Sequence, residues 1–203
     1  MSNRKKLGGL VLILAVPLFI LLFLEQFGEQ HYTIPTDPAE AEGLSAEVPA
    51  GALGQAFRLP VPLLNAKSKA QSSEDILGGI LIAYFSSLSY PDTTKLVLEK
   101  LTRVQNVFEQ DTLVLLLTVV PTKQLDTLLQ LTQQYRGQPG RWMFLGDTTH
   151  AYASAGVLPQ GTNAATLVLI GQAAKVRGFY DGTQEKEVDR LVAETRILLY
   201  DAK

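Results

Sequence analysis

The chain has 203 residues, of which 46% are hydrophobic and 19% charged, a composition typical of a globular protein rather than a disordered one. Its formal net charge of −2 leaves no basic excess with which to neutralise phosphates, so we expect no nucleic-acid partner. It contains no cysteine, which excludes disulfide exchange, thiol-dependent peroxide reduction and any copper or zinc site that needs cysteine ligands.

The N-terminal segment is typical of a membrane anchor. Leu7 to Leu24 form an uncharged run of 18 residues, which as a helix would be about 27 Å long and would just cross a bilayer's hydrocarbon core. Basic residues occupy positions 4 to 6, and Glu25 and Glu29 follow the run, so the positive-inside rule places residues 1–6 in the cytoplasm. A cleaved signal peptide is the alternative, but its apolar region is usually shorter. We therefore expect a single-pass protein of the inner (cytoplasmic) membrane with a periplasmic C-terminal domain.

Residues 25–55 are expected to form a flexible, acidic tether. From Phe27 to Gln55 the sequence contains three prolines, four glycines and five acidic residues, and it has no Lys or Arg. Such a segment is too polar and too interrupted to pack. Residues 56–203 then remain for one globular domain.

Two predicted strands are followed by a helix. Phe57 to Leu64 (FRLPVPLL) alternates but contains two prolines, which favours an edge strand or an extended entry segment. The continuous apolar run from Gly79 to Phe85 (GILIAYF) predicts a central strand covered on both faces. A helix is predicted after this strand because apolar residues recur at helical spacing: Val97, Leu101, Val104 and Phe108. Asp92 or Thr93 can cap its N-terminus.

A second strand, helix and strand follow. Leu113 to Val119 (LVLLLTV) predicts another buried strand, and Gly137 is placed to end the next helix, whose apolar face comprises Leu125, Leu128, Leu129, Leu131 and Tyr135. Trp142 to Leu145 predicts a short third strand, with Trp142 and Phe144 in the core. Thr148 to Ala155 could form a brief helix.

The C-terminal part predicts a hairpin and a helix. Leu167 to Gly171 and Lys175 to Tyr180 are expected to pair across a three-residue turn, with Phe179 and Tyr180 divided between core and surface by strand alternation. Thr183 can cap the last helix, which has acidic residues in its first turn and a buried side formed by Val188, Leu191, Val192 and Leu198.

The order of these elements, βαβα followed by ββα, predicts an α/β thioredoxin-like fold with a mixed central sheet and helices on both faces. In this fold the active loop joins the first central strand to the following helix, which here is the loop from Ser86 to Thr94 (SSLSYPDTT). That loop offers hydroxyl groups but no nucleophile with an evident base.

Several motifs, taken in order, resemble a known family. They are Ala83 and Phe85 at the end of the central strand, a loop that ends at Pro91, the LTRVQ motif at Leu101 to Gln105, and the whole segment from Leu167 to Leu199. Together with the anchor they resemble the SCO (SenC-like) family of membrane-anchored copper chaperones for cytochrome c oxidase assembly. The resemblance covers nearly the whole chain and is weakest between Pro121 and Thr166.

The resemblance also identifies where copper ligands would lie. The family binds copper through a C-x-x-x-C pair in the loop and a histidine just before the hairpin, and the matching positions are Tyr90, Thr94 and Asn163. Neutral phenol, hydroxyl and amide oxygens are poor substitutes for thiolate and imidazole. We therefore expect no metal site, no cofactor and no catalytic residue, and a non-enzymatic accessory that acts through a protein partner in respiratory oxidase or copper-handling machinery. Tyr90 and Pro91 are the candidate partner-binding residues, although Tyr90 could instead fill the emptied pocket.

Two alternatives remain open at this point. The protein could be a metal protein or an enzyme with a relocated site that uses His150, Asp147 or a loop serine such as Ser87 or Ser89. It could also be a purely structural subunit that stabilises a membrane complex.

Overall fold

The computed structural model describes residues 16, 53–59, 63–87, 89–138, 140–149 and 163–202, except for the side chain of residue 75. Outside these residues lie the predicted anchor except for residue 16, and the predicted tether up to residue 52. His150 and the rest of the predicted helix up to Ala155 lie outside them as well. Among the residues that are described, no helix has the length and apolar character needed to span a membrane. The elements below all belong to the unit Ile34–Lys203.

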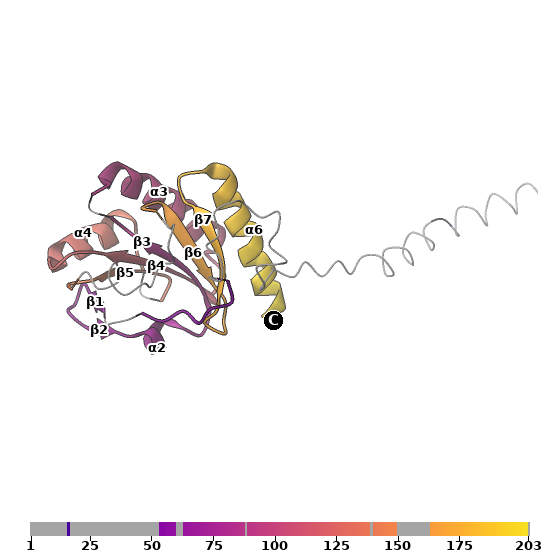
Figure 1. The fold of residues 1–203 in the computed structure, drawn as a ribbon, viewed down its shortest axis with the longest axis horizontal. Helices are drawn as coiled ribbons and strands as arrows, with labels where there is room; N and C mark the ends of the chain where they lie inside the picture. The colour runs from indigo at the N-terminus through magenta and orange to yellow at the C-terminus, as the bar shows by residue number, and fades with distance from the viewer. Residues whose placement is uncertain are drawn as a thin grey trace, which may run out of the picture. The chain divides into compact units, whose positions relative to one another are not determined.

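A seven-stranded mixed sheet forms the centre of this unit, in the order β2-β1-β5-β4-β3-β6-β7 (Figure 1). Strands β3, β4 and β5 are parallel to one another, whereas the other pairings are antiparallel. The strands are β1 (Leu63–Asn65), β2 (Ala70–Gln71), β3 (Ile80–Phe85), β4 (Val114–Val120), β5 (Trp142–Gly146), β6 (Thr166–Ile170) and β7 (Val176–Asp181). The predicted mixed sheet, the two central strands and the C-terminal hairpin are confirmed.

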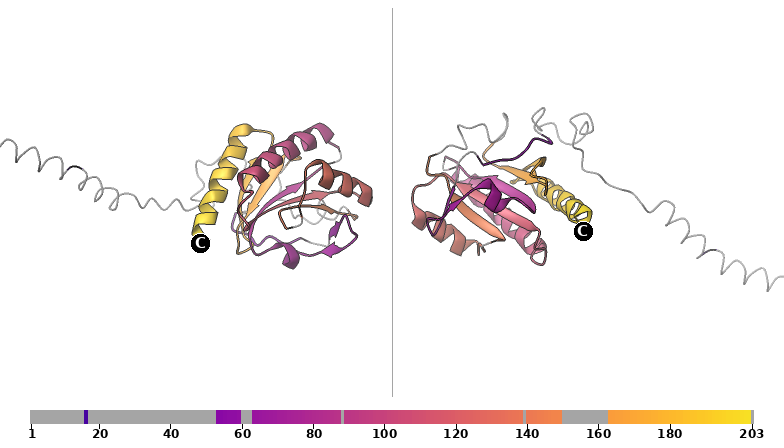
Figure 2. Two further views of the ribbon diagram at one scale, coloured as in Figure 1. Left: turned by 180° about the vertical axis from the view of Figure 1, so that it is seen from behind. Right: turned by 90° about the horizontal axis from the view of Figure 1, so that it is seen from below.

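Three long helices cover one face of the sheet: α3 (Pro91–Val107), α4 (Leu125–Gln134) and α6 (Glu185–Asp201), as the views in Figures 1 and 2 show. The second face is covered by residues 53–59 and by the four-residue helix α2 (Ser73–Ile76). The three predicted helices that the structure describes therefore lie on one face, and the only described helix on the other face is α2, which the sequence analysis did not predict.

Side-chain burial follows from this two-sided cover. All six residues of β3 are buried, and Trp142 and Phe144 lie in the core with ring centroids 5.1 Å apart, as predicted. The prediction that Phe179 and Tyr180 divide between core and surface is wrong, because only 6% and 2% of their areas are exposed. Phe179 packs in the apolar cluster of the second face and Tyr180 in the cluster under the long helices.

The entry to the domain differs from the predicted edge strand. Strand β1 begins only at Leu63, directly after Pro60 and Pro62 in the sequence, and proline has no N–H to give to a strand ladder. It also lies between β2 and β5, so the short β2 is the edge strand on that side. Before β1, Ala56 forms an antiparallel bridge with Lys175, and the Phe57 N–H donates to the Ala174 carbonyl at 2.6 Å.

Two predicted N-caps are wrong for local reasons. Helix α3 begins at Pro91 with Tyr90 as its N-cap, because proline's fixed φ suits the first helical position. Helix α6 has Gln184 as its N-cap, since the Thr183 hydroxyl instead donates to Asp181 Oδ1 at 2.6 Å. Neither N-cap side chain makes a capping hydrogen bond.

The end of α4 is displaced by one residue from the prediction. The N–H groups of Arg136 and Gly137 donate to the Gln133 and Thr132 carbonyls, at 3.3 and 2.7 Å. This is the Schellman pattern, in which the first residue after the cap adopts a left-handed conformation. Here that residue is Arg136, with φ of 52°, and not the predicted Gly137. An L-residue in this conformation costs about 1–2 kcal/mol relative to glycine.

Candidate functional site

The three positions that the sequence resemblance assigns to copper ligands lie at one edge of the sheet. The loop that contains Tyr90 and leads to Thr94 follows the C-terminal end of β3. Asn163 precedes β6, which is antiparallel to β3 and pairs Leu167 with Tyr84. Residues just before β6 must therefore lie beside residues just after β3.

Tyr84 joins these segments. Its side chain is fully buried, and its hydroxyl lies 3.0 Å from the Ala164 carbonyl oxygen and 3.3 Å from Thr94 Oγ1. The Thr94 hydroxyl in turn donates to the Ser87 carbonyl at 3.1 Å. A buried phenol therefore connects the loop, the first turn of α3 and the segment before β6. Burial raises the pKa of Tyr84, opposed by its hydrogen bond with Thr94, so the group stays a neutral phenol at neutral pH.

Asn163 is committed to the turn before β6. Its Oδ1 accepts from the Ala165 N–H at 2.8 Å and from Thr166 Oγ1 at 3.2 Å, and its own N–H donates to Thr166 Oγ1 at 3.0 Å. This pattern is that of an Asx turn. The amide oxygen that would have to replace an imidazole ligand is therefore already occupied.

Tyr90 is not packed into the site. Its side chain is 59% exposed, so it does not fill the space that a first cysteine would occupy. Its backbone is fixed, because its carbonyl accepts from the Thr94 N–H at 3.0 Å. Pro91 is exposed as well. The role of these two residues in partner binding stays a prediction, but the structure gives them the exposure that an interface residue needs.

In the described part of the chain, few groups are arranged to form the relocated metal or catalytic site of the alternative hypothesis. No group of three His, Cys, Asp or Glu residues there could hold a metal ion. Asp147 is buried, and its Oδ1 accepts from the N–H and hydroxyl of Thr149, both at 3.0 Å. The Ser86 hydroxyl donates to the Val119 carbonyl at 3.0 Å. His150, which the sequence paired with Asp147, lies outside the described residues.

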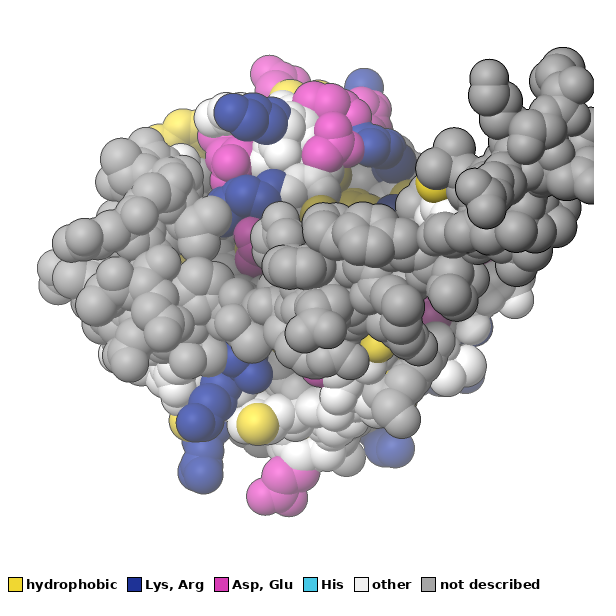
Figure 3. Space-filling view, turned by 90° about the vertical axis from the view of Figure 1, so that its right-hand side faces the viewer, with side chains coloured by type: hydrophobic (Ala, Val, Ile, Leu, Met, Phe, Trp, Pro, Cys, Tyr) yellow, Lys and Arg dark blue, Asp and Glu magenta, His cyan; other side chains and the backbone are white. Residues whose placement is uncertain are grey.

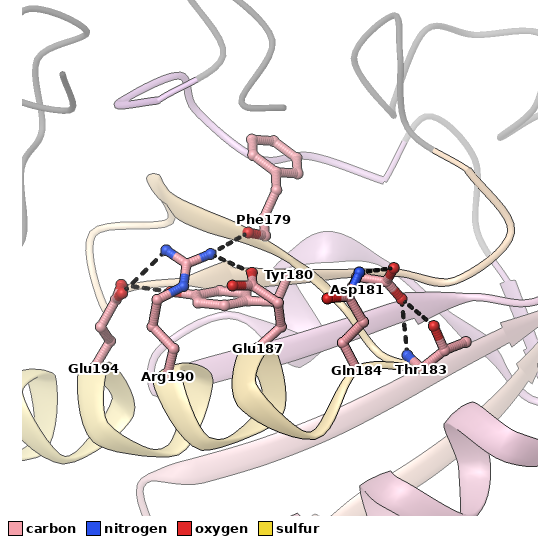
Figure 4. Close-up of polar contacts among 8 residues, drawn as sticks. All are labelled: Phe179, Tyr180, Asp181, Thr183, Gln184, Glu187, Arg190 and Glu194. Carbon is pink, nitrogen blue, oxygen red and sulfur yellow. Dashed lines mark hydrogen bonds and ion pairs between the residues drawn. The ribbon is translucent and has the colours of Figure 1, made fainter. Parts of the chain in front are cut away.

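A second polar cluster, which the sequence analysis missed, lies between β7 and α6 (Figure 4). The Arg190 guanidinium donates to Glu187 at 2.6 Å, to Glu194 at 3.3 Å and to the Phe179 carbonyl at 3.0 Å. It also lies 4.4 Å from the centre of the Tyr180 ring. The spacing of these residues on one helix face, three and four apart, is the signal that could have indicated the cluster.

Tyr180 completes the cluster. Its hydroxyl donates to Glu194 Oε2 at 2.5 Å, and its ring lies over Gly178, where a Cβ atom would overlap the hydroxyl. Burial raises the pKa of Tyr180 well above its ordinary value, and the carboxylate of Glu194 raises it further. All groups in the cluster are satisfied by one another except Arg190 Nε, so the arrangement fastens α6 to β7 and presents no reactive group.

The surface between α3 and α6 carries exposed ion pairs. Lys100 and Arg103 both pair with Glu185, and Arg103 also pairs with Asp189. Figure 3 views the side of the molecule on which α6 lies. At the top of this view, acidic and basic side chains lie next to one another. Exposed pairs of this kind contribute little to stability. Because the charges alternate, this part of the surface does not indicate a partner of strong net charge.

Replacing Tyr84 with phenylalanine should lower the free energy of unfolding by about 1–2 kcal/mol, because the Ala164 carbonyl and the Thr94 hydroxyl each lose a buried partner. Urea denaturation followed by the fluorescence of the single tryptophan, Trp142, measures the change. Tyr90→Phe is the matched control, with an expected change below about 0.5 kcal/mol because Tyr90 is exposed. Equal effects of the two substitutions would contradict the assigned role of the Tyr84 hydroxyl.

The stability of the domain should fall as pH rises above about 10, where Tyr180 ionises in the unfolded chain. The folded chain keeps the proton because the pKa of Tyr180 is raised there, so the unfolded state binds fewer protons and the slope is negative, up to about 1.4 kcal/mol per pH unit. This contribution is complete below pH 10. Unfolding free energies measured between pH 8 and pH 11 should therefore decline less steeply for Tyr180→Phe than for the wild type, and parallel curves would refute the assignment.

Comparison with known proteins supports the fold. No protein-family model matches the sequence, and no curated protein matches it either. A SCO1/SenC family lipoprotein from Bacillus anthracis has a TM-score of 0.59 at 15% identity, over 76% of this chain and 99% of that one. BsSco, a member of the Sco family of cytochrome c oxidase assembly proteins, has a TM-score of 0.55 at 17% identity, over 71% and 95% of the two chains.

A third similar structure is that of ScoI from Bradyrhizobium japonicum with copper bound, with a TM-score of 0.53 at 13% identity, over 70% of this chain and 97% of that one. At these identities the likeness is one of fold. The thioredoxin-like fold predicted from the sequence is confirmed, and the structures that share it include proteins of the family that the sequence motifs resemble.

Proposed function

We propose that this chain is a ligand-less relative of the SCO/SenC proteins, which acts through protein contacts in cytochrome c oxidase assembly or copper handling and catalyses no reaction. The observation that carries the proposal is that Tyr90, Thr94 and Asn163, to which the sequence resemblance assigns the copper-ligand positions, lie together at one edge of the sheet. Thr94 and Asn163 are engaged there in local hydrogen bonds.

The chemistry of these groups argues against a retained metal. A soft metal such as Cu(I) is held by thiolate, thioether and imidazole groups, and the site offers a phenol, a hydroxyl and an amide. Tyr84 is a second phenol beside the site, and its raised pKa keeps it from acting as a phenolate ligand at neutral pH. A chaperone that hands over copper needs a site that can hold it, so a role without copper transfer follows.

The exposed N-terminal end of α3 is the proposed contact surface. Tyr90 is 59% exposed and precedes the exposed Pro91, and aromatic residues with a rigid backbone are frequent anchors of interfaces. The proposal includes residues 7–24 as a single membrane anchor with residues 1–6 in the cytoplasm, which places the domain of residues 56–203 on the periplasmic side.

Copper titration of the full-length protein in detergent tests the absence of a copper site. Cu(I) and Cu(II) are added in the presence of a chelator, the protein is desalted, and copper is measured per chain. We expect no copper to be retained. Retention of one ion per chain would overturn the proposal.

Photo-crosslinking in membranes tests the contact surface. A photoreactive phenylalanine replaces Tyr90 in one variant and Tyr200, which is 78% exposed on α6, in a matched control. We expect a discrete protein adduct from position 90 that position 200 does not give. Equal yields of the same adducts would contradict the assignment of Tyr90. A stoichiometric adduct that persists through purification would instead favour the structural-subunit alternative.

A further inference from the structure

A polar cavity of about 400 Å³ lies at the edge of the sheet opposite to Tyr90. It lies where α3 ends and where the connection from α4 reaches β5, and its lining includes Val114, the first residue of β4. Because β3 and β4 are parallel, the first residue of β4 and the loop after β3 are at opposite ends of the strands. The cavity is therefore separate from the degenerate ligand positions.

The lining combines both signs of charge with many amide groups. Two arginines, Arg136 and Arg141, and one acidic residue, Glu109, are part of the lining. Apolar atoms of Phe108, Val114 and Leu116 contribute to the walls. Four carboxamide side chains complete the lining: Gln105, Asn106, Gln110 and Gln138.

Hydrogen bonds across the cavity hold its walls in place. Arg141 Nη1 donates to the carbonyls of Phe108, at 3.2 Å, and Glu109, so it is fixed against the end of α3. Gln105 Nε2 donates to the Arg136 carbonyl at 3.4 Å, which connects α3 to the end of α4. The cavity is therefore formed before any ligand binds.

Arg136 is the residue whose presence most needs an explanation. It occupies the left-handed position after α4, which glycine fills without strain. Among the described residues its guanidinium has no ion-pair partner, although it lines the cavity. A strained backbone at a residue with an uncommitted charged group is the kind of outlier from which a function can be inferred.

The distribution of charge identifies the class of ligand. The two guanidinium groups favour an anion, whereas the Glu109 carboxylate favours a cation. A simple anion or cation would meet repulsion from one half of the lining. A zwitterion satisfies both halves, and carboxamide side chains can pair with its peptide group through their N–H and C=O groups.

We propose that this cavity binds a small zwitterion of the size of an amino acid or a dipeptide, with its carboxylate on Arg136 and Arg141 and its ammonium group toward Glu109. A volume of about 400 Å³ lies within the range of small-ligand sites. The proposal does not depend on the contact surface at Tyr90.

Titration of the isotopically labelled full-length protein in detergent with glycyl-L-glutamine tests this site by NMR. We expect shifts in the side-chain amides of the four lining carboxamides and a Kd of about 1 mM or tighter. N-acetyl-glycyl-glutamine and glycyl-glutamine amide each lack one charge, and each should bind about tenfold more weakly. Equal binding of all three peptides, or no amide shifts with the unblocked one, would overturn the proposal.

Arg136→Gly is the most informative variant because glycine suits the backbone conformation at this position, so the fold is retained. We expect it to weaken glycyl-glutamine binding by about tenfold or more. The control is Arg196→Ala, which removes the same charge from an exposed position on α6 and should bind as the wild type does. Glu109→Gln should reduce the preference for the free amino group over the acetylated one. If Arg136→Gly bound glycyl-glutamine as tightly as Arg196→Ala, the assignment of the carboxylate would be wrong.

Discussion

Arg190→Met is expected to lower the free energy of unfolding by about 3 kcal/mol. The side chains of Arg190, Glu187 and Glu194 are only 21%, 17% and 13% exposed. Removing the guanidinium leaves two nearly buried carboxylates without their cation. The desolvation penalty of these carboxylates is then no longer offset by the ion pairs. Methionine keeps most of the side chain's volume, so loss of packing contributes little.

The matched control for this substitution is Arg103→Met. Arg103 also lies on a helix and pairs with two acidic residues, Glu185 and Asp189, but all three side chains are 44–56% exposed. The expected loss there is below about 1 kcal/mol, because water screens these pairs. Urea denaturation followed by Trp142 fluorescence measures both variants. Adding Glu187→Gln and Glu194→Gln to Arg190→Met should restore part of the lost stability, and a cost for Arg190→Met no greater than for Arg103→Met would refute this account.

The central elements of the fold could be predicted because their patterns are strong. A strand that is covered on both faces has no polar alternation, and the apolar runs that became β3 and β4 show this directly. The ends of the helices could not be placed, since they depend on competition between neighbouring groups. Thr183 could have capped α6, but its hydroxyl donates to Asp181 instead. Pro91 makes α3 begin before the predicted cap residues.

The buried polar contacts could not be predicted from the sequence. Tyr84 stands in the ILIAYF strand and reads as one more core residue, although a buried tyrosine hydroxyl usually finds a partner. Its partners, Thr94 and Ala164, lie 10 and 80 residues away along the chain. Arg190 reads as a surface residue of α6 until β7 brings the Phe179 carbonyl and the Tyr180 ring against it. Such contacts require the tertiary structure, which periodicity cannot supply.

Placing two cysteines and a histidine at positions 90, 94 and 163 should create a copper site in a chain that, under the proposed function, retains no copper. Tyr90 and Thr94 are one helical turn apart, as the 3.0 Å hydrogen bond between their backbones shows, so their Cβ atoms are about 5–6 Å apart. Asn163 adjoins Ala164, whose carbonyl shares the Tyr84 hydroxyl with Thr94. We expect the triple variant Tyr90→Cys, Thr94→Cys, Asn163→His to retain one Cu(I) per chain after desalting, because two thiolates and an imidazole are suitable ligands for it.

Moving one cysteine by a single residue supplies the control for geometry. In a second triple variant Lys95→Cys replaces Thr94→Cys, which turns the thiol by about 100° around the axis of α3 into an exposed position. This variant contains the same ligands, so nonspecific binding to thiols would be equal in the two, whereas a preformed site favours position 94. Retention should also weaken as pH falls, because protons compete for the thiolates and the imidazole. If the first variant retained copper and the second did not, the fold would have kept the geometry of a metal site whose loss rests on three side chains alone. If neither retained it, positions 90, 94 and 163 would not be the counterparts of the family's ligands.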